Sequence, residues 1–140
     1  MLKMTVWVGA LALGMAQMAS AQGTCPCGGG GDLVTKPGVL FSGKTVCAVA
    51  SSGSDRWQEY HAPSGDLIDY KLGAGHPVDP TTRVGSWSSS ATTLTHIYGP
   101  SASYVWSVCK DTTSGPYRFC NGSSAVVTNS TLIAGQQACP

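Results

Sequence analysis

Short segments in which apolar and polar residues alternate follow one another along the chain from residue 43 onward. They are rich in threonine, valine, tyrosine and tryptophan, and Gly, Pro, Ser and Asp separate them at intervals typical of β-strands and hairpins. No segment carries the long apolar repeat of about 3.6 residues that a surface helix needs. The pattern therefore predicts eight strands, at residues 45–50, 56–62, 67–72, 83–88, 92–98, 103–110, 117–120 and 124–128.

Consecutive strands with short connections indicate an antiparallel meander. A meander of this kind protects its exposed edges either by closing into a small barrel or by folding into a two-layer sandwich. We expect an all-β barrel of about eight strands, stabilised by disulfides, and keep the two-layer β-sandwich as the alternative. A helical turn at residues 55–58 is a local competitor, because Asp55 and Gln58 have the spacing of a capping box.

The strand pair around the turn at Pro63 contains a glutamate and a histidine beside aromatic residues. With Pro63 at the second position of a type I turn, the predicted register pairs His61 with Ile68 and Glu59 with Tyr70. This register places Glu59 and His61 on the apolar face, which points into the barrel. A slip of one residue would instead direct both side chains to solvent.

The inward positions of the predicted barrel bring aromatic and titratable side chains together. Strand alternation puts His96 and Tyr98 on one face of residues 92–98, and Trp106 on the apolar face of residues 103–110. A concave, mostly apolar interior with a few polar groups is the usual form of a small-molecule site, although a barrel of eight strands can also be filled by its own side chains. The predicted ligand-binding residues are Trp57, Glu59, His61, Tyr70, His96, Tyr98 and Trp106.

The N-terminus has the three-part pattern of a secretory signal peptide. Lys3 precedes an apolar run, and the small residues that end at Ala21 form a cleavage site. Gln17 interrupts the apolar run, which is shorter than the roughly 20 residues of a membrane-spanning helix. We therefore expect a secreted or periplasmic protein that is cleaved after Ala21 and has no membrane span afterwards.

Two further regions follow the predicted signal peptide at residues 1–21. Four consecutive glycines at residues 28–31 have too much backbone freedom for a helix or a packed strand, so residues 22–42 are predicted to form a flexible arm rich in Cys and Gly, tied down only if its cysteines are bonded. Residues 43–140 are predicted to form a single β domain. Because Lys3 leaves with the signal peptide, seven basic residues balance seven acidic ones. This balance argues against partners such as nucleic acid or an anionic membrane surface.

An even number of cysteines in an exported chain predicts a set of disulfides. The six cysteines are Cys25, Cys27, Cys47, Cys109, Cys120 and Cys139. Two arrangements are open: Cys109 bonds to Cys120 across a hairpin, or Cys47 bonds to Cys109 and Cys120 bonds to Cys139. The second closes longer loops and is slightly preferred. The Cys-Pro-Cys segment at residues 25–27 is a weak metal motif, because a metal ion would need two further ligands.

Motifs of catalysis are missing from the sequence: it has neither a Gly-x-Ser-x-Gly elbow nor a His-Glu-x-x-His zinc helix. We therefore predict no catalytic residue, metal or cofactor, and favour a protein that binds a small, partly apolar ligand over an enzyme. A hydrolase that uses His61 with a carboxylate such as Glu59, Asp69 or Asp79 is one alternative. Another is an inhibitor of a secreted hydrolase, which would recognise this protein partner through the loop at residues 73–80.

Overall fold

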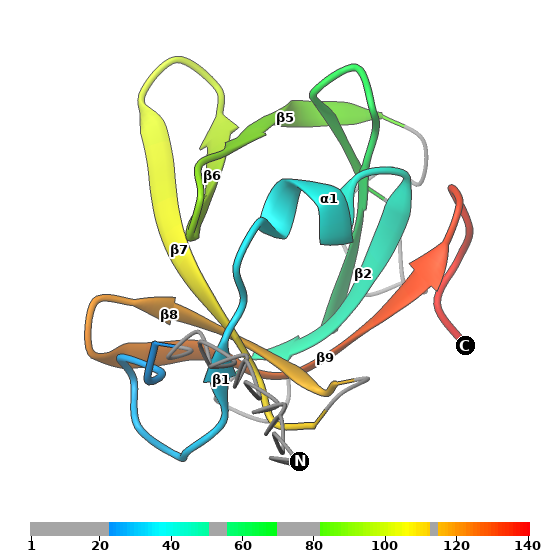
Figure 1. The fold of residues 1–140 in the computed structure, drawn as a ribbon. Helices are drawn as coiled ribbons and strands as arrows, with labels where there is room; N and C mark the ends of the chain where they lie inside the picture. The colour runs from blue at the N-terminus through cyan, green and yellow to red at the C-terminus, as the bar shows by residue number, and fades with distance from the viewer. Residues whose placement is uncertain (1–22, 51–55, 70–81, 113–114) are drawn as a thin grey trace, which may run out of the picture.

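The structure is a computed structural model that describes residues 23–50, 56–69, 82–112 and 115–140. Figure 1 shows the elements in these residues, which follow the order β1 (Asp32–Leu33), α1 (Pro37–Phe41), β2 (Lys44–Ala50), β3 (Arg56–His61), β4 (Asp66–Asp69), β5 (Arg83–Ser89), β6 (Thr93–Tyr98), β7 (Ala102–Lys110), β8 (Tyr117–Asn121) and β9 (Ser124–Ala134). The predicted signal peptide, Tyr70 and the loop at residues 73–80 lie outside the described residues.

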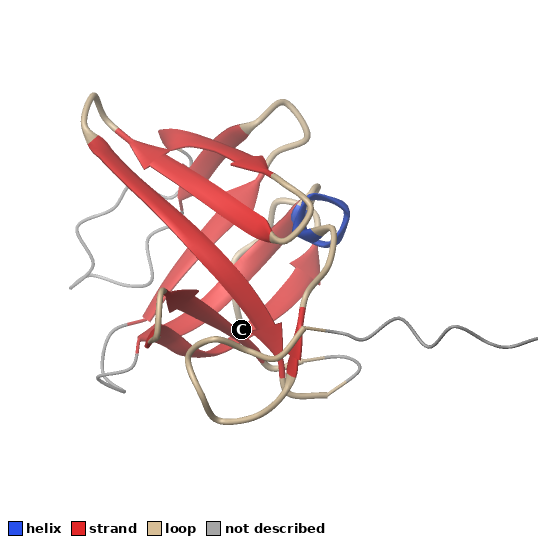
Figure 2. Cartoon of the chain, turned by 60° about the vertical axis from the view of Figure 1, so that its left-hand side comes forward, coloured by secondary structure: helices blue, strands red, loops and turns tan. Residues whose placement is uncertain are grey.

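Eight of the strands close into an antiparallel barrel. Strands β2 to β7 pair in sequence order, and the pairs β7–β8, β8–β9 and β9–β2 complete the ring. Strand β1 pairs with the last residues of β7, where Asp32 lies opposite Lys110. Figure 2 shows the strands crossing one another around a common centre. The predicted barrel is therefore confirmed, and the sandwich alternative is wrong.

The strand boundaries agree with the alternation of the sequence except at three places. Strand β9 continues to Ala134 instead of ending at residue 128, because its backbone pairs with β2 along its whole second half. Residues 56–58 belong to β3 and form no helical turn. The third difference lies in the predicted flexible arm, where both cysteines are bonded and β1 and α1 are found.

The predicted register of the hairpin between β3 and β4 is wrong by one residue. His61 lies opposite Leu67, and Glu59 lies opposite Asp69. Glu59 and His61 nevertheless point into the barrel, with 2% and 0% of their surface exposed. The change affects β4, where the fully buried Leu67 replaces the half-buried Ile68 as the inward apolar residue.

Helix α1 fills one end of the barrel, which we call the closed end. Figure 1 shows α1 across the middle of the ring of strands. Pro37 begins the helix at a position where its missing N–H costs nothing, and Phe41 ends it with its side chain fully buried. The Phe41 ring lies 5.3 Å from the His61 ring and 5.6 Å from the Phe119 ring, measured between ring centres. A short helix thus supplies an aromatic plug for the interior.

Three disulfides attach the terminal segments to the outside of the barrel. They join Cys25 to Cys109, Cys27 to Cys120, and Cys47 to Cys139. Both predicted arrangements are therefore wrong. The set fits an oxidising compartment, where disulfides persist.

The register of β7 and β8 explains why the hairpin bond between Cys109 and Cys120 does not form. Cys109 lies opposite Arg118, two residues away from Cys120. Both cysteines face outward, and the N-terminal arm lies across them. The C-terminal tail covers β2 and β3 in the same way: the Cys139 amide donates to Gln58 Oε1 at 2.7 Å.

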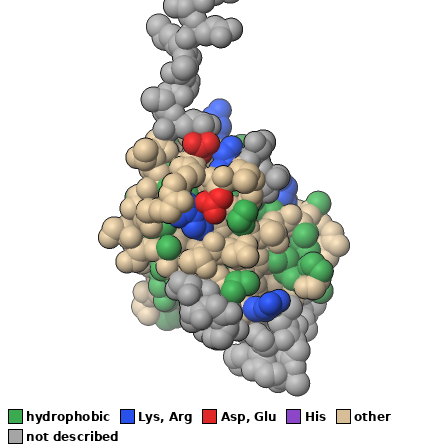
Figure 3. Space-filling model, turned by 90° about the horizontal axis from the view of Figure 1, so that it is seen from below, with side chains coloured by type: hydrophobic (Ala, Val, Ile, Leu, Met, Phe, Trp, Pro, Cys, Tyr) green, Lys and Arg blue, Asp and Glu red, His purple; other side chains and the backbone are tan. Residues whose placement is uncertain are grey.

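Charges are few and mixed on the face of the molecule seen in Figure 3. Basic and acidic side chains lie scattered among uncharged and apolar ones, with no large patch of one sign. This distribution agrees with the near-neutral balance of the sequence.

Candidate functional site

A cavity of 240 Å³ lies inside the barrel. Its lining comes from the first halves of β3, β7 and β9, the second half of β6 and the middle of β8, toward the end of the barrel opposite to α1. We call this the open end. Aromatic side chains dominate the lining, which consists of Trp57, His96, Tyr98, Tyr104, Trp106, Phe119, Val126 and Val127.

Flat ring faces make up much of the cavity wall. The rings of Tyr104 and Trp106 are stacked, with centres 5.6 Å apart and planes 9° apart. Phe119 meets the Trp106 ring edge to face at 6.1 Å and the Trp57 ring at 6.3 Å. Tyr104 and Val126 are 42% and 39% exposed, so they form the mouth of the cavity. Such a wall offers stacking surface to a planar molecule.

A chain of hydrogen bonds runs from the cavity wall into the core. Tyr98 Oη donates to the Glu59 carboxyl, at 2.8 and 3.0 Å from its two oxygens. His96 Nδ1 lies 3.2 Å from Tyr98 Oη, and His96 Nε2 lies 2.9 Å from His61 Nε2.

The single proton of Tyr98 determines the direction of this chain. When the Tyr98 hydroxyl donates its hydrogen bond to the ionised Glu59 carboxylate, the bond between Tyr98 and His96 must be donated by His96 Nδ1. His96 Nε2 then accepts from His61 Nε2. This leaves His61 Nδ1 as an acceptor, and among the described residues it is buried without a partner.

Burial controls the ionisation of the chain. It raises the pKa of Glu59 from 4.5 to about 8, with the hydrogen bond from Tyr98 opposing and the charge of Asp69 adding to the shift. It lowers the pKa of His96 from 6.5 to about 4. The pKa of His61 is also well below 6.5, because of burial and repulsion from His96. Burial together with the nearby Glu59 raises the pKa of Tyr98. Near neutral pH the chain is therefore uncharged for the most part.

The same residues form one of two groups with metal-ligand chemistry among the described residues. Ligand atoms of Glu59, His61 and His96 lie within 4.8 Å of one another, and zinc accepts both carboxylate and imidazole ligands. The facing nitrogens of the two histidines stand at hydrogen-bond distance. In this arrangement the group holds protons, and a metal ion would have to replace that bond.

The predicted ligand-site residues divide into three sets. Trp57, His96, Tyr98 and Trp106 line the cavity. Glu59 and His61 lie behind it and reach it through Tyr98 and His96. Tyr70 lies outside the described residues.

Four lining residues were not predicted: Tyr104, Phe119, Val126 and Val127. The alternation of β7 places Tyr104 on the same face as Trp106, so the sequence held a signal for it. The valines carried no such signal, because a bulge shifts the register between β8 and β9.

The residues proposed for a hydrolase are arranged differently from the expectation. Glu59 lies 3.5 Å from His96 Nδ1, whereas His61 is bonded to His96 and is fully buried. Asp79 lies outside the described residues, as does the loop at residues 73–80.

Comparison of the chain with protein-family models, curated proteins and solved structures finds no match in any of the three. The function is therefore inferred from the geometry of the cavity. Among the residues that the structure describes, no helix has the length and apolar character needed to cross a membrane.

Proposed function

We propose that the protein binds a small, flat, mostly apolar molecule in the cavity at the open end of the barrel. The observation that carries this proposal is a 240 Å³ cavity walled by stacked and edge-on aromatic rings. Large apolar cavities are unfavourable in a protein core, because lining atoms lose contacts. A ligand that fills the cavity restores those contacts.

The volume limits the ligand to about one or two fused rings. An apolar cavity of about 150 Å³ accepts benzene, and pockets for drug-sized ligands begin near 300 Å³. The cavity of 240 Å³ lies between these sizes.

One polar group in a residue of the cavity wall lacks a hydrogen-bond partner among the described residues. The Trp106 indole lines the cavity, and its buried Nε1–H has no hydrogen-bond partner among the described residues. A buried donor without a partner costs about 1–3 kcal/mol. We propose that a ligand with an acceptor oxygen or nitrogen beside its ring turns this donor toward itself, so we expect it to bind more tightly than the bare hydrocarbon.

The expected export of the protein supports a role in binding molecules outside the cytoplasm. The N-terminal sequence has the pattern of a secretory signal peptide, and the three disulfides suit an oxidising compartment. We therefore propose that the ligand is met in the periplasm or outside the cell.

The proposal is tested by closing the mouth of the cavity. Val126 lines the mouth, whereas Val105 is 52% exposed on β7 and lies outside the lining. We expect Val126→Trp to weaken binding of 2-naphthol at least tenfold in isothermal titration calorimetry. The matched control Val105→Trp should bind as the unchanged protein does.

Naphthalene, which has no hydroxyl group, should bind the unchanged protein more weakly than 2-naphthol. Failure of 2-naphthol, indole and phenol alike to bind the unchanged protein would contradict the proposal, as would equal binding by both tryptophan variants.

A further inference from the structure

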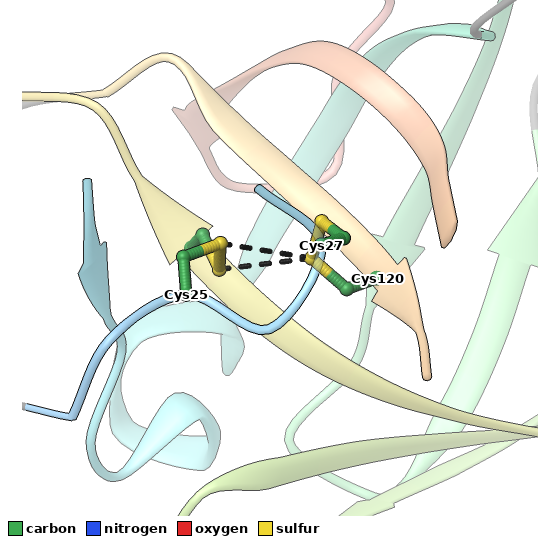
Figure 4. A group of neighbouring side chains, drawn as sticks. Cys25, Cys27 and Cys120 are labelled. Atoms are coloured by element: carbon green, nitrogen blue, oxygen red, sulfur yellow. Dashed lines mark hydrogen bonds between the residues drawn. A yellow bond between two sulfur atoms is a disulfide. The ribbon is translucent and has the colours of Figure 1, made fainter. Parts of the chain in front are cut away.

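Four cysteines from three separate segments meet at one point on the outside of the barrel. Cys120 Sγ lies 3.7 Å from Cys25 Sγ and 3.6 Å from Cys109 Sγ, although it is bonded to neither. With Cys27, all four sulfurs lie within 4.8 Å of one another. Figure 4 shows the sulfur pairs side by side between the arm and the strands.

This spacing matches the geometry of zinc bound by four thiolates. In a tetrahedral site with Zn–S bonds of about 2.3 Å, neighbouring sulfurs stand about 3.8 Å apart. The two non-bonded contacts of Cys120, at 3.6 and 3.7 Å, are already close to this value. The Cα atoms of the bonded pairs are 5.7 and 5.6 Å apart, so side-chain rotation alone can move their sulfurs to the same spacing.

Backbone hydrogen bonds hold the arm in place independently of the disulfides. Val34 N donates to Val108 O at 2.8 Å, and Leu33 lies opposite Cys109 in the pairing of β1 with β7. On the other side of the cysteines, Leu33 N donates to Gly23 O at 3.0 Å. The segment that carries Cys25 and Cys27 is therefore anchored to the barrel near both of its ends.

Arg118 holds the glycine run at residues 28–31 through hydrogen bonds to its backbone. Its guanidinium donates to the carbonyl oxygens of Gly28 and Gly30, which follow Cys27, and lies 2.8 Å from Asp111 Oδ1. Residues 28–31 all have positive φ angles, between 72° and 84°, and wrap around this group. Contacts of this kind orient ligand-bearing segments in metal sites.

We propose that Cys25, Cys27, Cys109 and Cys120 bind one zinc ion as a tetrathiolate site when the two disulfides are reduced. Each disulfide takes two electrons and two protons from a dithiol reductant and gives two thiols. The four thiols then release four protons as zinc binds. Cys109 and Cys120 are fully buried, whereas Cys25 and Cys27 are half-buried, so the ion enters from the arm side.

The Cys-Pro-Cys segment at residues 25–27 provides only two of the four ligands that a zinc ion needs. Its two missing ligands are supplied by β7 and β8, which pair with each other in the barrel. The site also lies on the outer face, so it is independent of the proposed ligand cavity inside. The arm is thus fastened by zinc in a reducing environment and by two disulfides in an oxidising one.

The test uses cobalt as a spectroscopic substitute for zinc. The full chain is reduced with a phosphine under anaerobic conditions and titrated with Co²⁺, then with Zn²⁺. We expect one Co²⁺ per chain, the thiolate charge-transfer and d–d bands of a tetrahedral four-sulfur site, and displacement by one equivalent of zinc.

Two variants assign the ligands. The double variant C47S/C139S removes the disulfide outside the cluster and should keep the cobalt spectrum and stoichiometry. The double variant C25S/C27S leaves the barrel cysteines and should lose the four-sulfur spectrum.

Three results would overturn the proposal. They are no metal binding by the reduced chain, loss of the spectrum in C47S/C139S, and an unchanged spectrum in denaturant, which would show that unfolded thiols suffice. Near-ultraviolet circular dichroism of the cobalt form, compared with the oxidised protein, reports whether the barrel stays folded during the titration.

Discussion

The two ends of the barrel are made of the same kind of strand ends, yet one is filled and the other holds a cavity. At the closed end, α1 inserts Phe41, which is fully buried. At the open end, the described residues leave a space of 240 Å³ beneath the partly exposed Tyr104. A barrel of eight strands therefore need not be wholly solid or wholly hollow, because one short helix decides which half is packed.

The hydrogen-bonded chain lies where the two ends meet. His61 contacts the Phe41 ring of the plug, and His96 and Tyr98 belong to the wall of the cavity. Between them, the Glu59 carboxyl accepts a hydrogen bond from Tyr98 Oη. We therefore expect a structural change at either end of the barrel to affect the same buried chain of hydrogen bonds.

Among the variants that test the difference between the two ends, removal of the Phe41 ring should change the free energy of unfolding most. Phe41→Ala deletes a fully buried ring and leaves a void at the closed end, so we expect a loss of about 3–5 kcal/mol in the free energy of unfolding. Urea unfolding measures this loss. Val39 on the same helix is 79% exposed, and Val39→Ala should stay within about 0.5 kcal/mol. Equal losses in the two variants would mean that α1 does not plug the barrel.

The pH dependence of stability tests the chain between the two ends. Above pH 6.5, unfolded glutamate is ionised, whereas folded Glu59 keeps its proton until its pKa of about 8. Folded Glu59 thus binds more protons than unfolded Glu59, which lowers stability as the pH rises. The unfolded histidines still lose protons just above pH 6.5 and offset about half of this loss, so we expect a net fall of about 1 kcal/mol between pH 6.5 and 8.

Below pH 6.5 the sign reverses. Burial lowers the pKa values of His61 and His96 in the folded state, so the two histidines bind protons only when the protein is unfolded. Below pH 6.5 they take up more protons on unfolding than Glu59 releases, so stability falls as the pH decreases. We therefore expect maximum stability near pH 6.5 in urea unfolding measured as a function of pH. Glu59→Gln should abolish the decline toward pH 8. A decline that persists in this variant would contradict the assignment.

A smaller effect should follow from removing the phenol at the cavity wall. In Tyr98→Phe, Glu59 loses the hydrogen bond that lowers its pKa, so this pKa should rise further above its ordinary value. The stability cost should be about 1 kcal/mol. Glu59 is the only glutamate in the sequence, so ¹³C labelling of glutamate gives one carboxyl resonance to titrate by NMR. An unchanged or lowered midpoint would show that Tyr98 does not bond to Glu59 in solution.

The inward direction of Glu59 and His61 was predicted from a register that is wrong by one residue, in which the apolar face of residues 67–72 placed both side chains inside. In the structure β2 completes the inward face of β3, and the buried Val46 lies opposite Glu59. The turn at residues 62–66 changed the register by one, which reversed the faces of β4 but not of β3. The predicted pairing of β7 with β8 was wrong by two residues. A shift of two residues leaves every side chain on the same face of its strand, so the inward direction of Trp106 was predicted correctly.

Helix α1 and the disulfides could not be read from local pattern. Five residues are too few to show a helical repeat, and Pro37 and Gly38 resemble a turn in sequence. The disulfides join residues 84 to 93 positions apart, so their pairing depends on where the terminal segments lie on the finished barrel. Tertiary packing, not sequence spacing, decides both features.

The four glycines at residues 28–31 invite comparison with a linker, whose exact length rarely matters. Here alternate carbonyls of the run meet the two terminal nitrogens of one buried guanidinium, and a methyl group at Gly29 would lie 2.2 Å from Arg118 Nη1. Deleting or inserting one glycine would move these carbonyls off the nitrogens that they accept from. We therefore expect the number of glycines in this run to matter, and we expect substitution to strain the backbone because all four φ angles are positive.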